Sequence, residues 1–451
     1  MEREKFGSRL GFILISAGCA IGIGNVWRFP YVAGYYGGGF FVLFYLLFLV
    51  ILGVPVLSME LAVGRAGRAS IAKAYNNLEK PGQKWHIHGV VGLIGNYLLL
   101  FFYTTVAGWM LGYFLKYISG GMNKVSDSGK LFSQVLENPS QMIVWMLMVV
   151  VLSVLVCSLG LKNGVERITK WMMLILLGLI LVLAIHSFTL DKAGEGIAYF
   201  LIPNIERVKE TGFWNMVIAA MNQSFFTLSL GIGAMLIFGS YIEKDRSLLS
   251  ESIQITILDT FVAVMSGFII FPACFSFDIP TDSGPSLIFI TLPKVFENMA
   301  GGQIWGTLFF LFMTFAALST VIAVLENILA CNMELFNISR MRASIINFIV
   351  LAVGGLPCLL GFNVLSNVQL LGEGSTILDF EDFLVSNISL PFGSLVIILF
   401  CVSKFGWGFK NYLAECNTGA GIKMSGKLKI YLTWILPLIV LFIAFYGLFK
   451  F

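Results

Sequence analysis

Two Gly-Ile-Gly tripeptides, Gly22–Gly24 and Gly231–Gly233, each interrupt a long apolar run of the sequence. Glycine is a poor helix former because it loses much conformational freedom on ordering and exposes the backbone. Within a membrane, a broken helix is tolerated only where it is buried in protein or lines a cavity. Two broken spans at matching places in the two halves of a chain indicate the binding site of a secondary transporter.

The residues around the first break offer groups for both a cation and an anion. Unwinding near Gly22 would free the main-chain carbonyl groups of Gly18, Ala20 and Ile21 for a small hard cation. Asn25 follows with a side-chain oxygen. The half-helix after the break presents N–H groups, which favour an anion such as a carboxylate. A close glycine-mediated helix contact would explain the glycines but not Asn25.

Hydroxyl groups lie at the second break and in a later apolar run. Thr227 and Ser229 place hydroxyl and carbonyl oxygens at the break, with the large apolar ring of Phe226 beside them. Ser319 and Thr320 are adjacent hydroxyl residues within a later helix. Such hydroxyls bind either a ligand or a carbonyl of the preceding helical turn, and the sequence leaves both alternatives open.

A few charged residues fall in or beside the apolar runs. An ionisable residue inside a membrane is expensive, so Asp259, about one third into its run, is a functional candidate. Glu60 ends its run, which fits an interfacial position. Arg28 would face the acids Asp379 and Asp382, either as a gate over a pocket or as an interfacial ion pair of little energetic value.

The composition defines the elements that must position these residues. Of 451 residues, 58% are hydrophobic and 12% charged, and the mean hydropathy is +0.88. These values predict an all-α polytopic membrane protein embedded in a lipid bilayer. The formal net charge of +4 is too small to indicate a nucleic-acid partner. Eleven apolar runs predict transmembrane helices near 9–33, 38–64, 88–119, 140–160, 165–189, 213–241, 249–275, 303–335, 343–361, 380–404 and 428–449.

These helices divide into two halves of five, each beginning with a broken helix. We expect a first inverted repeat at 1–190, a second at 191–410 with an outer loop helix near 286–299, and an inner loop with the eleventh helix at 411–451. Lys and Arg are more frequent in the segments on one side. This asymmetry predicts a cytoplasmic N-terminus and a C-terminus outside.

Three segments make the chain resemble the neurotransmitter:sodium symporter family: GIGNVWRFP at 22–30, SFFTLSLGIG at 224–233 and SGFIIFPA at 266–273. The resemblance implies the leucine-transporter fold, a 5+5 inverted repeat plus an eleventh helix. The chain is most similar to short bacterial members with eleven helices, which carry tyrosine and other hydrophobic amino acids. It also implies a location in the bacterial inner (plasma) membrane.

The family roles carried over to this sequence give two sodium sites, a substrate site and two gates. The first sodium site would use Ala20, Asn25, Thr227 and Asp259. The second would use Gly18, Ile21, Ala316, Ser319 and Thr320. The substrate would contact Cys19, Ala20, Gly22, Gly24, Leu99, Tyr103, Phe226, Thr227, Ser229, Ile232, Val324 and Ser319. The outer gate would be Arg28 with Asp382, and the inner gate Arg3, Tyr241 and Glu334.

Two departures from the family pattern bear on mechanism. Asp259 stands where many members, including chloride-dependent ones, have Asn. A carboxylate there supplies the negative charge itself, so we expect chloride independence, and a returning proton would imply counter-transport. Ile232 replaces a Phe of the leucine transporter's pocket, which should leave more room.

The resulting hypothesis is a sodium-coupled symporter. It would import a hydrophobic or aromatic L-amino acid (tyrosine, tryptophan, phenylalanine or leucine-like) with two sodium ions, by alternating access. The alternative is a transporter-like amino-acid sensor or a leak channel. An enzyme is not expected, because the sequence has no HExxH motif, no GxS nucleophile elbow and no paired catalytic carboxylates. The sequence does not predict the oligomeric state.

Overall fold

The architecture comes from a computed structural model, which describes residues 4–124, 127–278 and 287–449. Within these ranges, nine helices are long and apolar enough to cross a membrane. They are α3–η2–α4 (Gly39–Gly67), α6 (Ile87–Ile118), α8 (Pro139–Ser158), η4–α9 (Leu161–Ser187), α14 (Leu248–Ser276), α16 (Gly302–Phe336), α17–α18 (Arg340–Leu360), α19–η6–α20 (Ile377–Val402) and η7–η8–α22 (Gly426–Leu448).

Two further spans are broken. The helix α1 (Arg9–Ala20) and the segment η1–α2 (Gly24–Tyr35) pass together as one apolar span, bent by 58° at the break. The helices α12 (Phe213–Thr227) and α13 (Ala234–Tyr241) flank the second break. With these two, the helices match the eleven predicted runs to within a few residues. Helix-length apolar runs are therefore enough to predict the spans.

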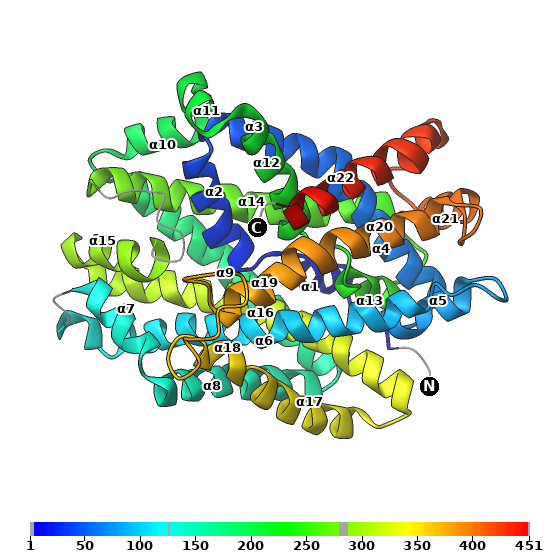
Figure 1. The fold of residues 1–451 in the computed structure, drawn as a ribbon, viewed down its shortest axis with the longest axis horizontal. Helices are drawn as coiled ribbons and strands as arrows, with labels where there is room; N and C mark the ends of the chain where they lie inside the picture. The colour runs from blue at the N-terminus through cyan, green and yellow to red at the C-terminus, as the bar shows by residue number, and fades with distance from the viewer. Residues whose placement is uncertain (1–3, 125–126, 279–286, 450–451) are drawn as a thin grey trace.

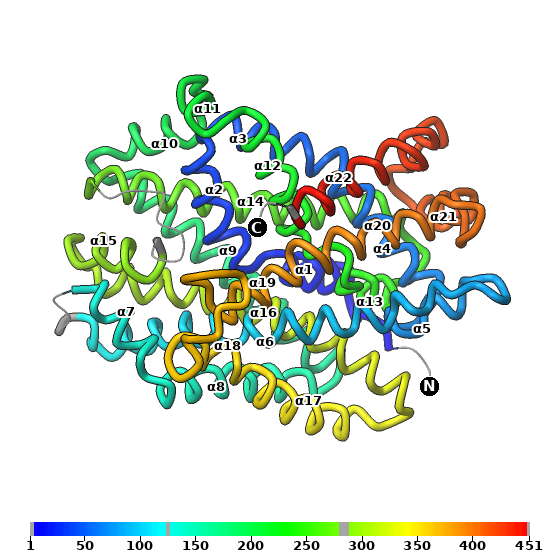
Figure 2. Tube along the Cα trace, in the orientation of Figure 1, coloured from blue at the N-terminus to red at the C-terminus, as the bar shows by residue number. Residues whose placement is uncertain are grey.

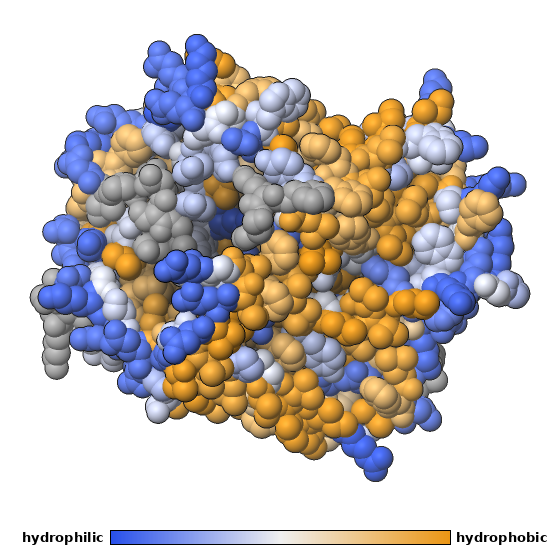
Figure 3. Space-filling model, viewed as in Figure 1, coloured by the Kyte–Doolittle hydropathy of each residue, from blue (hydrophilic) through white to orange (hydrophobic). Residues whose placement is uncertain are grey.

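The spans run roughly along the long axis of the molecule (Figure 1). One end carries α5 (Ile71–Leu78) and α21 (Phe409–Cys416), and the other carries α7 (Ser128–Leu136), α10 (Ala193–Leu201) and α15 (Leu292–Asn298). Hydrophilic side chains gather at these two ends, and hydrophobic side chains cover much of the surface between them (Figure 3). This banding is what a bilayer requires of a protein that crosses it.

The broken helices lie at the centre of the bundle. The helix α1 packs against α13 and α16, and α16 packs against α6. Figure 2 shows α1 and α13 in the middle of the molecule, although they are about half the chain apart. Segments from both halves therefore meet where each half is unwound, which is where the sequence predicts the site.

The second break shows why glycine is needed there. Between α12 and α13, Ser229, Gly231 and Gly233 have φ angles of 51°, 101° and 75°. A Cβ atom on Gly231 would lie 2.2 Å from the carbonyl oxygen of Leu390. Both the left-handed backbone and this close approach favour glycine at position 231. The unwound segment therefore packs directly against α19–η6–α20 (Ile377–Val402).

The remaining short elements lie at the ends of the spans. The expected outer loop helix near 286–299 is present as η5 (Leu287–Thr291) followed by α15, and Ser286 falls outside the described residues. A further short helix, α11 (Ile205–Thr211), precedes α12.

Candidate functional site

A polar triad of Asn25, Thr227 and Asp259 forms at the centre of the bundle, and its members come from η1, α12 and α14. The Asn25 Nδ2 donates to Asp259 Oδ1 at 2.7 Å and to Thr227 Oγ1 at 2.8 Å. The Thr227 hydroxyl donates to Asp259 Oδ2 at 2.9 Å. All three side chains are buried. A carboxylate, a hydroxyl and an amide thus converge away from lipid, in reach of the first break.

The first break supplies backbone groups to the same region. Ala20 is the last residue of α1, so no later N–H group of this helix can donate to its carbonyl oxygen. The Gly22 N–H donates to Asn25 Oδ1 at 3.2 Å. The Ile23 N–H donates to the phenolic oxygen of Tyr103 at 2.9 Å. The break therefore combines free carbonyls on its α1 side with N–H groups on its η1 side.

A second cluster of oxygens, the carbonyl site, surrounds the hydroxyl of Thr320. Its Oγ1 lies 3.3 Å from the Gly18 and Ile21 carbonyl oxygens, 3.4 Å from that of Ala316 and 3.5 Å from that of Cys19. One hydroxyl can donate only one proton, so these acceptors outnumber the donor. A surplus of buried oxygen ligands without a net charge suits a small hard monovalent cation.

Ser319 and Thr320 both contact main-chain carbonyl oxygens in the structure, but of different helices. Ser319 donates its hydroxyl to the Ala316 carbonyl of its own helix at 2.9 Å. Thr320 also lies near Ala316, but it reaches across to the end of α1. The two adjacent hydroxyls therefore differ: one is bound mainly within its helix, and the other joins two helices.

A small cavity of about 20 Å³ adjoins the carbonyl site through Thr320 and the first break through Ala20, Gly22 and Gly24. It is lined by Ala20, Gly22, Gly24, Leu99, Tyr103, Phe226, Ser229, Thr320, Val385 and Leu390. Its polar side is the broken backbone with the Tyr103 hydroxyl. Its apolar side is formed by the side chains of Leu99, Val385 and Leu390.

Five residues predicted to contact substrate do not line this cavity. Thr227 belongs to the polar triad, and Ser319 bonds within α16. The other three, Cys19, Ile232 and Val324, are fully buried around it. The Ile232 side chain packs near Gly95 of α6, because a Cβ on Gly95 would lie 3.1 Å from its Cγ2. The extra room expected at Ile232 is therefore not at the cavity wall.

The cavity wall includes two residues that the sequence reasoning missed. Val385 lies in η6 (Leu384–Ser389), and Leu390 begins α20 (Leu390–Val402). They reach the site because the second break packs on this segment: a Cβ on Gly393 would lie 2.1 Å from the Gly231 carbonyl oxygen. Apolar residues in an apolar helix carry no sequence pattern that distinguishes cavity wall from core.

A larger vestibule cavity of about 180 Å³ shares Gly24, Tyr103 and Phe226 with the small one. Its other lining residues are Ile23, Trp27, Arg28, Tyr31, Phe102, Val106, Leu378 and Asp382. Tyr103 and Phe226 therefore line both cavities.

The predicted outer-gate residues face the same cavity without pairing. The described ion pairs do not include one between Arg28 and Asp382. Instead, the Arg28 guanidinium lies 4.2 Å from the centre of the Phe226 ring. Asp382 accepts a hydrogen bond from Ser386 at 2.7 Å. Each residue is therefore held by its own neighbour in this structure, and the gate formed by Arg28 and Asp382 stays a prediction.

The position of Glu60 at the end of an apolar run predicts an interfacial side chain, and this prediction is wrong. Glu60 is fully buried, not interfacial. Its carboxylate accepts from the Gly231 N–H at 3.1 Å and from the Met235 N–H at 3.2 Å. These are orphan donors at the start of α13, where an anion is favoured. Glu60 therefore holds the second break open.

The inner-gate prediction is incomplete. The Tyr241 hydroxyl donates to Glu326 Oε1 at 2.9 Å, and Glu326 also pairs with Arg340 at 2.7 Å. Glu334 accepts from the main chain and hydroxyl of Ser70. Tyr241 and Glu334 line one cavity of about 300 Å³ together with Arg340. The predicted Arg3 lies outside the described residues.

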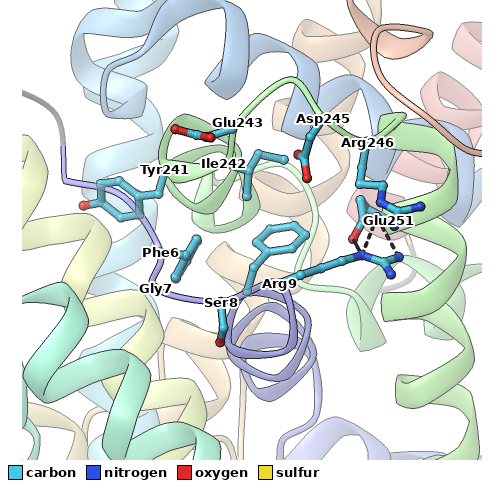
Figure 4. A pocket seen from close by; sticks show the side chains of 11 residues that line it. Phe6, Gly7, Ser8, Arg9, Tyr241, Ile242, Glu243, Asp245, Arg246 and Glu251 are labelled. Atoms are coloured by element: carbon cyan, nitrogen blue, oxygen red, sulfur yellow. Dashed lines mark hydrogen bonds and ion pairs between the residues drawn. The ribbon is translucent and has the colours of Figure 1, made fainter.

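A neighbouring pocket of about 190 Å³ lies beside the N-terminal segment (Figure 4). Figure 4 shows Arg9 reaching Glu251, while Tyr241 points to the opposite side. The Arg9–Glu251 distance is 2.9 Å. Lys5 binds the exposed carboxylate of Glu243 at 2.7 Å, and this hydrogen bond lowers the pKa of Glu243. Lys5 in the segment before α1 is thus tied to Glu243 after α13, and Arg9 at the start of α1 is tied to Glu251 in α14.

Comparison with known proteins identifies the family. The model of the sodium:neurotransmitter symporter family matches residues 3–124 and 116–451. The chain belongs to this family. An uncharacterized sodium-dependent transporter of Bacillus subtilis (strain 168), YhdH, is 35% identical over 99% of this chain and 98% of the relative. An uncharacterized sodium-dependent transporter of Haemophilus influenzae is 30% identical over 99% of each.

A solved structure, MhsT in complex with L-phenylalanine, superimposes with a TM-score of 0.88 and 36% identity over 99% of this chain and 100% of that one. This confirms the predicted fold class, the leucine-transporter fold with a 5+5 inverted repeat and an eleventh helix. This symporter-family chain is a sodium-dependent transporter that crosses the membrane many times. Its relatives are transporters, in agreement with the expectation that it is not an enzyme.

Proposed function

We propose that this transporter imports a hydrophobic or aromatic L-amino acid together with two sodium ions, by alternating access. The observation that carries the proposal is the small cavity with broken backbone on one side and aliphatic side chains on the other, and with Thr320 of the carbonyl site on its wall. The substrate carboxylate would lie at the Gly22–Gly24 break against the Tyr103 hydroxyl. Its side chain would face Leu99, Val385 and Leu390. A relative of this fold binds L-phenylalanine, which supports the substrate class.

In this proposal the polar triad and the carbonyl site each bind one sodium ion. The first ion would contact the Ala20 carbonyl, Asn25, Thr227 and Asp259, and the substrate carboxylate. The amide of Asn25 would turn its oxygen toward that ion. The second ion would be held by the carbonyls of Gly18, Ile21 and Ala316 with the hydroxyls of Ser319 and Thr320. A zwitterion entering with two sodium ions moves two charges, worth about 5 kcal/mol per 100 mV.

The buried carboxylate of Asp259 supports chloride independence. In the polar triad it supplies a fixed negative charge beside the first sodium site. A chloride ion would add a second negative charge to the same buried region at high cost. When sodium leaves, a proton on Asp259 would neutralise the empty carrier on its return.

The gates and the orientation complete the proposal. Arg28 and Asp382 would close over the vestibule cavity on the outer side, and Tyr241 with Glu326 would open on the inner side. The N-terminus would lie in the cytoplasm and the C-terminus outside, in the bacterial plasma membrane. The repeats would be residues 1–190 and 191–410, followed by 411–451.

Uptake in proteoliposomes tests this function. With an inward sodium gradient, we expect labelled phenylalanine, tyrosine or tryptophan to accumulate above its external concentration. Competition with all twenty amino acids would define the substrate. Unchanged uptake when choline replaces sodium would contradict the proposal, and binding without uphill accumulation would favour the sensor or leak channel.

A further inference from the structure

Two adjacent carboxylic acids of α19 (Ile377–Phe383) differ in their surroundings. Asp382 lines the vestibule cavity opposite Arg28. Glu381 turns away from this cavity and is 7% exposed. A second acid beside a gate residue, packed into the protein and not into the vestibule, has no part in the transport scheme given above.

Among the described residues, no base forms an ion pair with Glu381. The thiol of Cys358 in α18 (Leu356–Leu360) lies next to its carboxyl group and next to the hydroxyl of Thr105 in α6. The other acids on its own helix are Asp379 and Asp382. The facing elements α6 and α18 therefore present a hydroxyl and a thiol, and the nearby titratable groups are acidic or neutral.

Two buried polar atoms in this cluster have no hydrogen-bond partner. They are the Oε2 of Glu381 and the Oγ1 of Thr105. An ionised carboxylate without a cation is very costly in such surroundings. A protonated carboxyl group, by contrast, can donate one hydrogen bond to a neighbouring hydroxyl or thiol and still accept another. The geometry therefore matches the neutral acid.

We propose that Glu381 is a positioning residue of the outer gate, protonated while α19 packs against α6 and α18, and that it makes gate closure sensitive to external pH. The inference rests on the proposed function, since it takes Arg28 and Asp382 as the outer gate. On deprotonation, the proton passes to external water and the carboxylate must move toward water. Asp382 is the next residue of α19. The same movement would therefore shift Asp382 away from a position in which it can pair with Arg28.

The direction in which gate closure depends on external pH follows from the protonation state that closure needs. Gate closure needs the neutral form of Glu381, so it is favoured at low external pH and weakened as the pH rises. We expect the apparent KM of uptake to rise with external pH in the wild type. For a single proton the increase is at most about tenfold per pH unit.

The test measures sodium-driven uptake of labelled phenylalanine by the full-length protein in proteoliposomes. Sodium is saturating, the internal pH is fixed, and the external pH is varied from mildly acidic to mildly alkaline. Glu381→Gln keeps the shape and the hydrogen-bonding groups of the neutral acid. We expect it to transport with a KM that no longer rises with pH. Asp379→Asn, a matched change of an exposed acid on the same helix, should follow the wild-type profile.

Further variants separate the role of the proton from that of packing. Glu381→Met removes the titrating group and should also flatten the KM profile, so it serves if the glutamine variant does not fold. Glu381→Asp keeps the titrating group and should retain a rise. Identical KM profiles for the wild type and Glu381→Gln would overturn the inference, as would a wild-type KM that does not change with pH. Absence of sodium-driven uptake by the wild type would instead overturn the proposed function.

Discussion

The two oxygen clusters at the centre of the transporter, which we propose as sodium sites, are formed by different chemical groups. The polar triad uses side chains from three separate helices, one of them the buried carboxylate of Asp259. The carbonyl site uses main-chain carbonyls from the end of α1 and from Ala316 of α16, which surround the hydroxyl of Thr320. One cluster carries a net charge and the other does not.

The difference shows how each cluster depends on the sequence. Side-chain ligands are lost with one substitution, and a buried charged group leaves its partners unsatisfied when it is removed. Backbone ligands persist as long as the helix is broken at the same place. We therefore expect substitutions in the polar triad to disable transport, and substitutions at the carbonyl site to shift sodium affinity.

The largest effect should come from Asp259→Ala. The variant leaves the Asn25 amide and the Thr227 hydroxyl without their acceptor, at about 1–3 kcal/mol for each buried group. We expect uptake to fall about 100-fold or more. Sodium-driven uptake in proteoliposomes measures this, and uptake within a few-fold of the wild type would show that the triad is not an ion site.

Asp259→Asn is its matched variant, because it keeps the shape and removes the charge. We expect weaker sodium coupling, or transport that becomes sensitive to chloride. Normal transport in the absence of chloride would contradict the idea that the carboxylate replaces the anion.

The second-largest effect is expected for a substitution that removes a charge at the second break. Glu60→Gln replaces a carboxylate that accepts from Gly231 and Met235 by a neutral amide. Hydrogen bonds to charged groups contribute about 1.5–3 kcal/mol each, so we expect substrate binding to weaken about 10- to 100-fold. Radioligand binding measures this, with the exposed Glu373→Gln as control. Equal behaviour of the two variants would show that Glu60 does not maintain the break.

A moderate effect is expected at the carbonyl site. Thr320→Val keeps the side-chain volume and removes the shared oxygen, so the sodium concentration for half-maximal binding should rise about tenfold. Substrate affinity at saturating sodium should stay close to that of the wild type. Thr314→Val is the control, because Thr314 is buried in the same helix and bonds only to Phe310 in the described hydrogen bonds. If the sodium concentration for half-maximal binding rises equally in Thr320→Val and Thr314→Val, the change reports helix packing and not ion binding.

The smallest effect should be that of Tyr103→Phe. The ring remains, but the hydroxyl is lost, which accepts from the Ile23 N–H, lies in hydrogen-bond contact with Thr320 and in the proposal faces the substrate carboxylate. We expect substrate affinity to fall about fivefold, with sodium binding at the carbonyl site retained. Tyr113→Phe, on the same helix and bonded to Phe289, is the control. Parallel loss of substrate and sodium binding in Tyr103→Phe would argue against separate roles.

Much of this architecture could be predicted from the sequence because membranes impose simple rules. Apolar runs of helical length predict the spans, and glycines within them predict the breaks. Asn25, Thr227 and Asp259 were found because polar groups are rare in such helices. Their convergence into one hydrogen-bonded triad agrees with the prediction, although binding of sodium there remains to be measured.

The features that the sequence did not predict depend on how helices pack. Glu60 looks interfacial by its position in the run, but its carboxylate lies against the start of another broken helix. Glu326 is an acid in an apolar helix and could have been found by the same rule as Asp259. Val385 and Leu390 are ordinary apolar residues, and only their contact with the second break brings them to the cavity.

The central claim is that both clusters bind sodium during each transport cycle. Simultaneous uptake of labelled sodium and labelled phenylalanine by proteoliposomes, at a clamped membrane potential, tests it most directly. The account predicts about two sodium ions for each amino acid, given one ion per cluster and inward charge movement that responds to voltage. A ratio of one sodium ion per amino acid, in both the wild type and Thr320→Val, would contradict the assignment of a sodium ion to the carbonyl site.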